Sequence, residues 1–333
     1  METFEAYCRK YLQQWEDRCA IRTVRRTRVS EVAPDDPVFP AAMQPLVRHP
    51  EVLALGPAAV REVLVRTAYA MQAGLADAEV DVVAVLCGRL ANGRHDFPLP
   101  PGARQVALAI GTDEYYHALV AREFIEDLAA ATGLEPGVEA RPEEASNLQA
   151  ALAFLHAEAP ADIRPVADIV ALCFAEHYVT ERMFGLAKET RAGSAFQQVT
   201  REHLMDEGRH QRFFEVLLRH LWAEIGEDGR LALGGLLPGF FDRFLASSQA
   251  LRAQYRAILQ AIGFSAESAA AIFGESFAPP PGAAPLPKHA IPPAAHCLDL
   301  VTSAGLLAHA PTRDRLVAEG WVAADPVAPA VAG

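Results

Sequence analysis

Two copies of one five-residue pattern carry acid and imidazole side chains at a spacing suited to metal binding. They are Asp113-Glu114-Tyr115-Tyr116-His117 and Asp206-Glu207-Gly208-Arg209-His210. In a helix, residues i and i+3 lie on the same face, so each copy can direct one carboxylate oxygen and one imidazole nitrogen to the same point. Two such helices facing each other build the carboxylate-bridged dinuclear metal site of a four-helix bundle.

That architecture also needs one Glu from each of the two other helices. Glu79 and Glu176 are the candidates because each falls on the apolar stripe of its predicted helix. His203 precedes Glu207 by one turn and lies within about 60° of it and of His210 on the helix face. It can therefore add a third nitrogen ligand, the alternative being an ordinary core or surface histidine.

One arrangement of ligands follows as a hypothesis. The first metal ion is bound by Glu79, Glu114 and His117, the second by Glu176, His203 and His210, and the ions are bridged by Glu207 and Glu114. Burying four carboxylates without cations would be close to prohibitive, which favours the metal interpretation over a metal-free helical interaction protein.

The Asp before each Glu has a predicted role of its own. A ligand histidine needs an acceptor for its other ring N–H, which fixes the orientation of the ring. Asp113 and Asp206 each precede a ligand Glu by one residue and point sideways, so each is expected to hold the histidine of the opposite motif. The alternative for both is a solvated surface carboxylate.

Apolar residues spaced by three or four predict four long helices, over 57–91, 103–132, 162–190 and 195–225. Ordinary globular helices average about 12 residues, whereas helices of this length suit a bundle. The predicted fold is therefore all-α, a four-helix bundle with additional N- and C-terminal helices.

The remaining segments are arranged around that bundle, and a short helix at 143–157 connects its halves. The predicted divisions are an N-terminal helix with a proline-rich connector (1–56), the bundle (57–225), additional helices (226–276, with one helix over 238–262), a Pro/Ala-rich linker (277–295), and short C-terminal helices with a disordered tail (296–333).

Composition excludes several classes of function. The 333 residues carry a formal net charge of −12, which argues against nucleic acid or an anionic membrane as a partner. The five cysteines are scattered, and the N-terminus lacks the features of a signal peptide. No apolar run approaches the roughly 18 residues of a membrane helix. A cytoplasmic protein with reduced thiols is expected.

The order and spacing of these residues from Glu79 to His210 resemble the di-iron N-oxygenases typified by p-aminobenzoate N-oxygenase, over about residues 35–225. The third histidine, His203, is the most specific part of the resemblance. It implies a ferritin-like bundle with four Glu and three His ligands, two iron ions and O2. The implied reaction oxidises an amine nitrogen of a natural-product precursor to hydroxylamine, and onward to nitroso or nitro. Manganese stays open because Glu and His suit both metals.

The resemblance also bears on partners and substrate. Electrons are expected from an external donor such as a ferredoxin with its reductase, because the sequence holds no flavin or nicotinamide motif. The resemblance implies that the p-aminobenzoate enzyme holds the substrate carboxylate with polar side chains, whereas the expected pocket positions here, which include Gly74 and Leu186, are apolar or small. A small amine other than p-aminobenzoate is therefore expected. The pocket is predicted to be lined by Met71, Leu75, Phe184 and Tyr115 or its neighbour Tyr116.

Two other functions stay open with the same metal ligands. One is a di-iron hydroxylase or desaturase that acts at carbon, and the other is a ferritin-like ferroxidase that stores iron. The sequence leaves a homodimer open as well, since residues 226–333 could either cap the pocket or bury a dimer interface.

Overall fold

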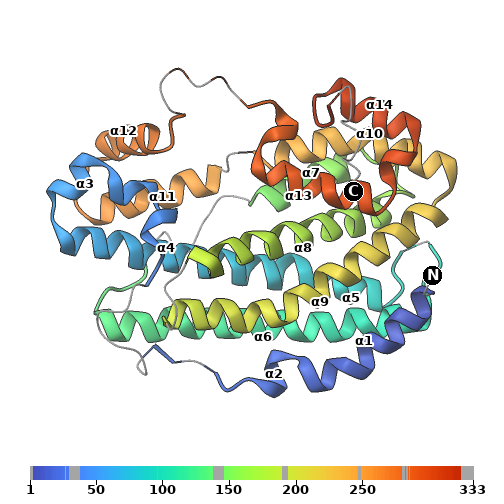
Figure 1. Cartoon of the computed structure of the whole chain (residues 1–333), viewed down its shortest axis with the longest axis horizontal. Coiled ribbons are helices and arrows are strands. Elements are labelled where there is room, and N and C mark those ends of the chain that lie inside the picture. The colour runs from blue at the N-terminus through green and yellow to red at the C-terminus, as the bar shows by residue number, and fades with distance from the viewer. Residues whose placement is uncertain are drawn as a thin grey trace, which may run out of the picture.

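The computed structural model describes residues 3–26, 28, 29, 38–95, 97–137, 146–189, 194–246, 249–279, 282, 284 and 286–323. Within these ranges every regular element is a helix, and four long helical stretches run side by side (Figure 1). The expectation of an all-α bundle is confirmed.

The four stretches match the four predicted helices. The first comprises α4 (Pro57–Ala78), a π-helical turn (Glu79–Val83) and α5 (Ala84–Ala91), and the others are α6 (Pro101–Thr132), α8 (Arg164–Glu189) and α9 (Ala195–Glu224). The first stretch packs along α6, and α8 packs along α9. Local chemistry sets the ends of these helices: Gly133 ends α6 in a left-handed conformation (φ 70°), and the Ser194 side chain caps α9 by accepting from the Gln197 N–H.

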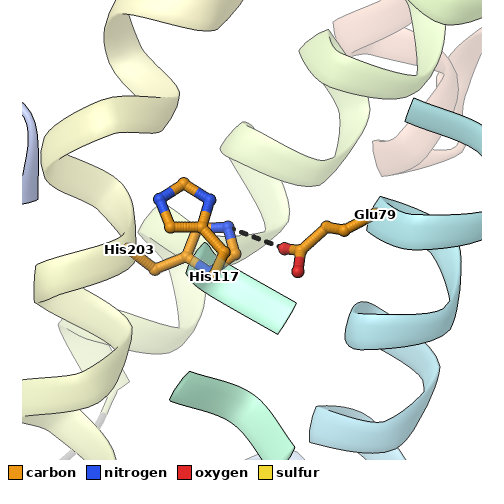
Figure 2. A group of neighbouring side chains, drawn as sticks. All are labelled: Glu79, His117 and His203. Atoms are coloured by element: carbon orange, nitrogen blue, oxygen red, sulfur yellow. Dashed lines mark ion pairs between the residues drawn. The ribbon is translucent and has the colours of Figure 1, made fainter. Parts of the chain in front are cut away.

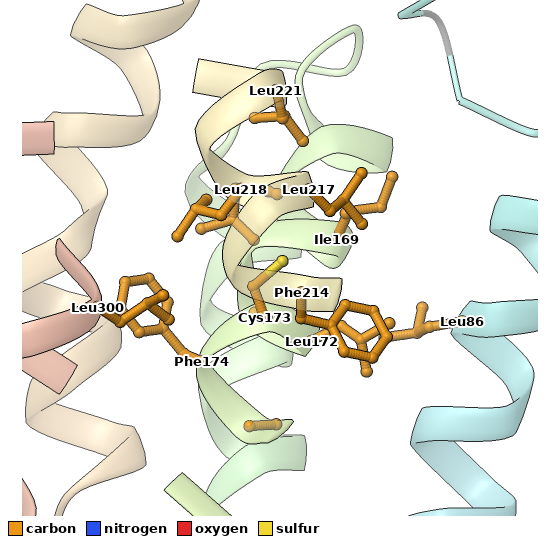
Figure 3. Close-up of a cluster of buried hydrophobic side chains, with 14 of the residues drawn as sticks. Leu86, Ile169, Leu172, Cys173, Phe174, Phe214, Leu217, Leu218, Leu221 and Leu300 are labelled. Atoms are coloured by element: carbon orange, nitrogen blue, oxygen red, sulfur yellow. The ribbon is translucent and has the colours of Figure 1, made fainter. Parts of the chain in front are cut away.

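Apolar side chains fill the bundle on one side of the acid-bearing turns. Figure 3 shows Phe214, Leu217 and Leu221 of α9 packed with residues of α8. Phe214 and Leu217 have no exposed surface. Such packing holds the helix axes fixed, which a site made of side chains from four helices requires.

The N-terminal segment packs along the outside of α6 and α9. It comprises α1 (Phe4–Arg18) and α2 (Ala20–Thr23) (Figure 1). The connector that follows is less extended than predicted: two short 3-10 turns (Ala41–Met43 and Pro45–Arg48) and α3 (Pro50–Ala54) form there. Its residues 30–37 lie outside the described part of the chain.

The remaining helices lie on the α8 side of the bundle or at its ends (Figure 1). They are α7 (Asn147–Glu158), α10 (Gly226–Phe244), α11 (Gln249–Ala261), α12 (Ala266–Ser276), α13 (Pro292–Ser303) and α14 (Ala310–Ala318). Among the described residues, no helix is both long and apolar enough to span a membrane.

The single helix predicted over 238–262 is wrong, because α10 begins at Gly226 and ends at Phe244, and α11 begins at Gln249. Packing requires two of the glycines in α10. A Cβ at Gly234 would lie 1.9 Å from the Thr312 side chain, and one at Gly239 would lie 2.4 Å from the Phe154 ring.

Three other expectations concern chain segments between or after these helices. The predicted linker is shorter at its end, since α13 begins at Pro292. A turn is expected at Gly193 and Ser194 and a disordered tail from Ala323, and of these Gly193 and residues 324–333 lie outside the described residues.

Candidate metal centre

Glu79, His117 and His203 form the first of two groups of acid and histidine side chains inside the bundle (Figure 2). All three are buried, and one candidate ligand atom of each lies within 4.8 Å of the others. Nε2 of His203 is 3.2 Å from Oε1 of Glu79. The His203 and His117 rings stack with their centroids 4.0 Å apart. The π turn, α6 and α9 each supply one member.

Glu114, Glu176, Glu207 and His210 form the second group, also buried and also within 4.8 Å of one another. Nδ1 of His210 lies 2.8 Å from Oε1 of Glu114, 3.3 Å from Oε1 of Glu207 and 4.0 Å from Oε2 of Glu176. α6, α8 and α9 supply these side chains. The two groups together contain all seven side chains that the sequence singled out.

Glu207 connects the two groups. Its Oε1 lies 3.2 Å from Nε2 of His203 and 3.5 Å from Nδ1 of His117, in addition to its contact with His210. The Thr180 hydroxyl lies 3.3 Å from Oε2 and donates to it. A carboxylate in this position can contact two cations at once.

His203 belongs to a different group from the one hypothesised. The sequence hypothesis assigned it to the metal ion of Glu176 and His210, whereas its ring lies with Glu79 and His117. The reason is its place on α9: His203 precedes Glu207 by one turn and His210 follows Glu207 by one turn. The two rings therefore lie on opposite sides of Glu207 along the helix.

The two aspartates pair across the motifs as expected. Asp206 accepts from Nε2 of His117 at 3.0 Å, and Asp113 accepts from Nε2 of His210 at 3.2 Å. Both aspartates are fully buried. Because Nε2 of each ring is engaged, Nδ1 of each ring is left facing the carboxylates.

Donors from the N-terminal segment hold both aspartates. Trp15 Nε1 donates to Oδ2 of Asp113 at 2.8 Å. The Ala20 N–H donates to both oxygens of Asp206, at 3.2 and 3.1 Å, and the Arg209 guanidinium forms an ion pair with the same carboxylate. Sequence reasoning missed Trp15 and Ala20, because no spacing rule connects them to residues about a hundred or more positions away.

Each of the seven side chains has at least one buried polar atom without a hydrogen-bond partner. These atoms are both carboxylate oxygens of Glu79, Oε1 of Glu114, Nδ1 of His117, Oε2 of Glu176, Nε2 of His203, Oε1 of Glu207 and Nδ1 of His210. Unpartnered buried polar atoms are rare and costly. Oxygen and imidazole nitrogen atoms converging in this way match the donors that iron or manganese requires, so the residues fit a dinuclear metal centre.

Burial sets unusual charge states in this cluster. It raises the pKa of Glu79 and of Glu176 well above the ordinary 4.5, because neither carboxylate can ionise cheaply without water. For Glu207, burial acts in the same direction, but the nearby imidazoles of His203 and His210 outweigh it and hold the pKa well below 4.5. For His117 and His210, nearby carboxylates outweigh burial and raise the pKa of both.

The residues predicted to line the substrate pocket do not all lie in the interior. Met71 and Leu75 of α4 are partly buried. Tyr115 and Phe184 are 57% and 39% exposed, so neither side chain joins the buried cluster. Tyr115 follows Glu114 directly, and one step of about 100° turns it away from the ligand face of α6. Tyr116 is partly buried.

The π turn at Glu79 is a second feature that sequence reasoning missed. The Ala84 N–H bonds the carbonyl of Glu79, five residues earlier, instead of four. Such turns occur often at functional sites. The segment contains Val80, Val82 and Val83, which weaken regular helix, but valines alone do not specify a π turn.

An all-α bundle whose long helices bring Glu and His side chains to two adjoining points has the ferritin-like architecture. A family model described as "P-aminobenzoate N-oxygenase AurF" matches residues 27–269, and the chain belongs to this family of oxygenases. The matched segment contains all seven clustered side chains, whereas α1 and α2 precede it. No curated protein matches the chain.

Proposed function

We propose that this protein is a non-haem di-iron oxygenase that uses O2 to oxidise the amine nitrogen of a small molecule. The observation that carries the proposal is the convergence of seven side chains, each with an unpartnered buried donor atom, in a chain of this family. Bound iron would supply the redox chemistry with O2, and the protein supplies geometry and a buried site.

The chain's own residues have distinct roles in this proposal. Glu79, His117 and His203 would hold one metal ion, and Glu114, Glu176 and His210 would hold the other. Glu207 would contact both. Asp113 and Asp206 accept the Nε2 protons of the two motif histidines and so present Nδ1 of each to the metal.

The substrate is proposed to be an amine with an apolar body. Met71 and Leu75 have apolar side chains and precede Glu79 by eight and four residues, about two turns and one turn of helix. Such apolar surface favours an amine with an apolar body over a carboxylate-bearing substrate such as p-aminobenzoate. Electrons are proposed to come from an external donor, such as a ferredoxin with its reductase.

Metal content and products test the proposal together. Purified protein should contain about two iron ions per chain. Reduced protein given arylamines and ¹⁸O2 should yield hydroxylamine, nitroso or nitro products that carry the label on nitrogen. Label on carbon would replace the proposal with carbon oxidation. Large shells with ferric mineral on a sizing column would replace it with iron storage, and a chain that takes up no metal would remove it.

A further inference from the structure

A hollow of about 330 Å³ lies between α5, α7 and α8, apart from the acid and histidine cluster. We call it the α5–α8 hollow. Its apolar lining includes Leu86, Leu90 and Ile169, which are 5%, 1% and 4% exposed. Sites for small molecules start at about this volume and combine apolar walls with a few polar groups.

Three arginines surround the same hollow: Arg89, Arg94 and Arg164. All three are exposed at its mouth. Asp168 is the only acid among the lining residues, so the three arginines and this carboxylate leave a formal charge of +2. That local excess contrasts with the chain's net charge of −12.

The hydrogen bonds of the lining leave cationic donors free for a ligand. Asp168 is already paired with Arg89 at 3.1 Å and with His156. Within the described part of the chain, Arg164 uses only its Nε, which donates to the carbonyl of Ala159 at 3.1 Å. Among the described residues, the guanidinium of Arg94 has no hydrogen-bond or ion-pair partner.

We propose that the α5–α8 hollow binds a small organic carboxylate. The carboxylate would be held by Arg94 and Arg164, because a guanidinium matches a carboxylate with two parallel hydrogen bonds. The apolar part of the ligand would cover Leu86, Leu90 and Ile169. Phosphate has a similar head group but no apolar part to use these walls.

This site is separate from the candidate metal centre, and the proposal does not rest on the proposed function. Leu86 follows Glu79 by seven residues and Ile169 precedes Glu176 by seven, a rise of about 10 Å in each helix. Buried side chains including Leu172, Cys173 and Phe214 occupy the neighbouring core (Figure 3). A ligand the size of benzoate therefore cannot contact the arginines and the acid cluster together.

Binding of three probes tests the charge and the apolar contact separately. Benzoate carries both, benzamide carries the ring without the charge, and inorganic phosphate carries charge without the ring. Calorimetry or ligand-observed NMR should detect benzoate binding to the full chain. Its dissociation constant should rise about 10- to 100-fold in an Arg94→Gln/Arg164→Gln double variant. Arg9→Gln, an exposed arginine of α1, is the matched control and should leave it unchanged.

Several outcomes would overturn the proposal. Equal binding of benzamide and benzoate would remove the role of the arginines, and so would unchanged benzoate binding in the double variant. Binding of phosphate but not of benzoate would reassign the hollow to an inorganic anion. Should the double variant fail to fold by circular dichroism, crystals of the unaltered chain with 4-iodobenzoate decide: an iodine anomalous peak in the hollow supports the site, and one only at the acid cluster overturns it.

Discussion

The two Asp–His pairs at the centre of the bundle use the same motif with different support. Asp206, paired with His117, receives two hydrogen bonds from the Ala20 N–H and an ion pair from Arg209. Asp113, paired with His210, receives one neutral donor, Trp15 Nε1, and its Oδ1 is buried without a partner. One carboxylate is fully engaged, whereas the other depends on a single indole.

The motif determines which histidine each aspartate faces, and the residues around the motif determine how strongly the aspartate is held. The repeated Asp-Glu-x-x-His spacing suffices to point each aspartate at the other motif's histidine. The variable residues do the rest: Arg209 lies inside the second motif, and the first has Tyr116 at the same position. Hydrogen bonding and charge from His117 outweigh burial and lower the pKa of Asp206, with Arg209 adding to the effect.

The largest effect is expected from removing Glu207, the carboxylate that lies beside both groups of candidate ligands. Glu207→Ala should reduce the metal content of the chain from two ions to nearly none, because Glu207 lies beside His203, His117 and His210. Elemental analysis after reconstitution measures this. Glu181→Gln, a partly exposed acid on α8, is the control. Retention of two ions in Glu207→Ala would contradict the bridging role.

Replacing each aspartate compares the two halves directly. Loss of a carboxylate that orients a metal-binding histidine typically weakens metal binding about 10- to 100-fold. The loss for Asp206→Asn should lie at the upper end, because this change also removes the negative charge that pairs with Arg209, and the loss for Asp113→Asn at the lower end. Competition with a chelator gives both constants. Equal losses would mean that the unequal support has no energetic consequence.

Trp15→Phe removes the indole donor of the weaker half and keeps an aromatic ring. Among the described residues, Trp15 is the one donor to the Asp113 carboxylate besides His210, and its loss should lower the free energy of unfolding by about 1–3 kcal/mol. Metal affinity should fall only several-fold. Chemical denaturation and chelator competition measure the two effects. Trp222→Phe, in α9 away from both aspartates, is the control for loss of an indole. An Asp113→Asn/Trp15→Phe double variant no worse than Asp113→Asn would support action through Asp113.

The smallest expected effect is a pH dependence of metal stabilisation. In metal-free protein, raised pKa values at Glu79 and Glu176 mean that ionising either one costs stability as pH rises above 4.5. Raised values at His117 and His210 add stability below 6.5 that is lost as pH rises through their folded pKa. Both contributions lower the free energy of unfolding as pH rises. The lowered pKa of His203 affects stability only below pH 6.5, where the unfolded chain protonates this histidine more readily than the folded one.

Metal binding has the opposite pH dependence. Carboxylate and imidazole ligands must be deprotonated to bind a metal ion, so metal binding strengthens as pH rises. The increase in melting temperature on adding iron or manganese should therefore be several degrees larger at about pH 8.5 than at about pH 6.5. Differential scanning calorimetry measures it. An increase that shrinks with pH would contradict the assigned protonation states.

The sequence predicts the cluster well because its information is local. Glu114, His117, Glu207 and His210 follow from i, i+3 spacing, and Glu79 and Glu176 follow from their apolar stripes. The structure brings all of them together with His203. The grouping of His203 could not be predicted, since it depends on how α9 is placed along its axis against the π turn.

Long-range features escape the same reasoning. Trp15 reaches Asp113 across 98 positions, and Ala20 reaches Asp206 across 186, through a segment outside the family match. The bounds of α10 escaped for a related reason. Gly234 and Gly239 weaken the local helical signal, but they permit close contact with Thr312 and Phe154.

The π turn at Glu79–Val83 makes this helix one residue longer than a regular helix of the same span. Deleting one residue there, for example Asp81, would let the backbone relax into an ordinary helix. Leu86 and Leu90 would then keep their places in the core, whereas the same deletion in a regular helix would rotate every later side chain by about 100°. A related chain with a regular helix here would have one residue fewer. An alignment of the two chains needs a gap within the turn, because without it every residue from Ala84 onward would be paired with the wrong residue.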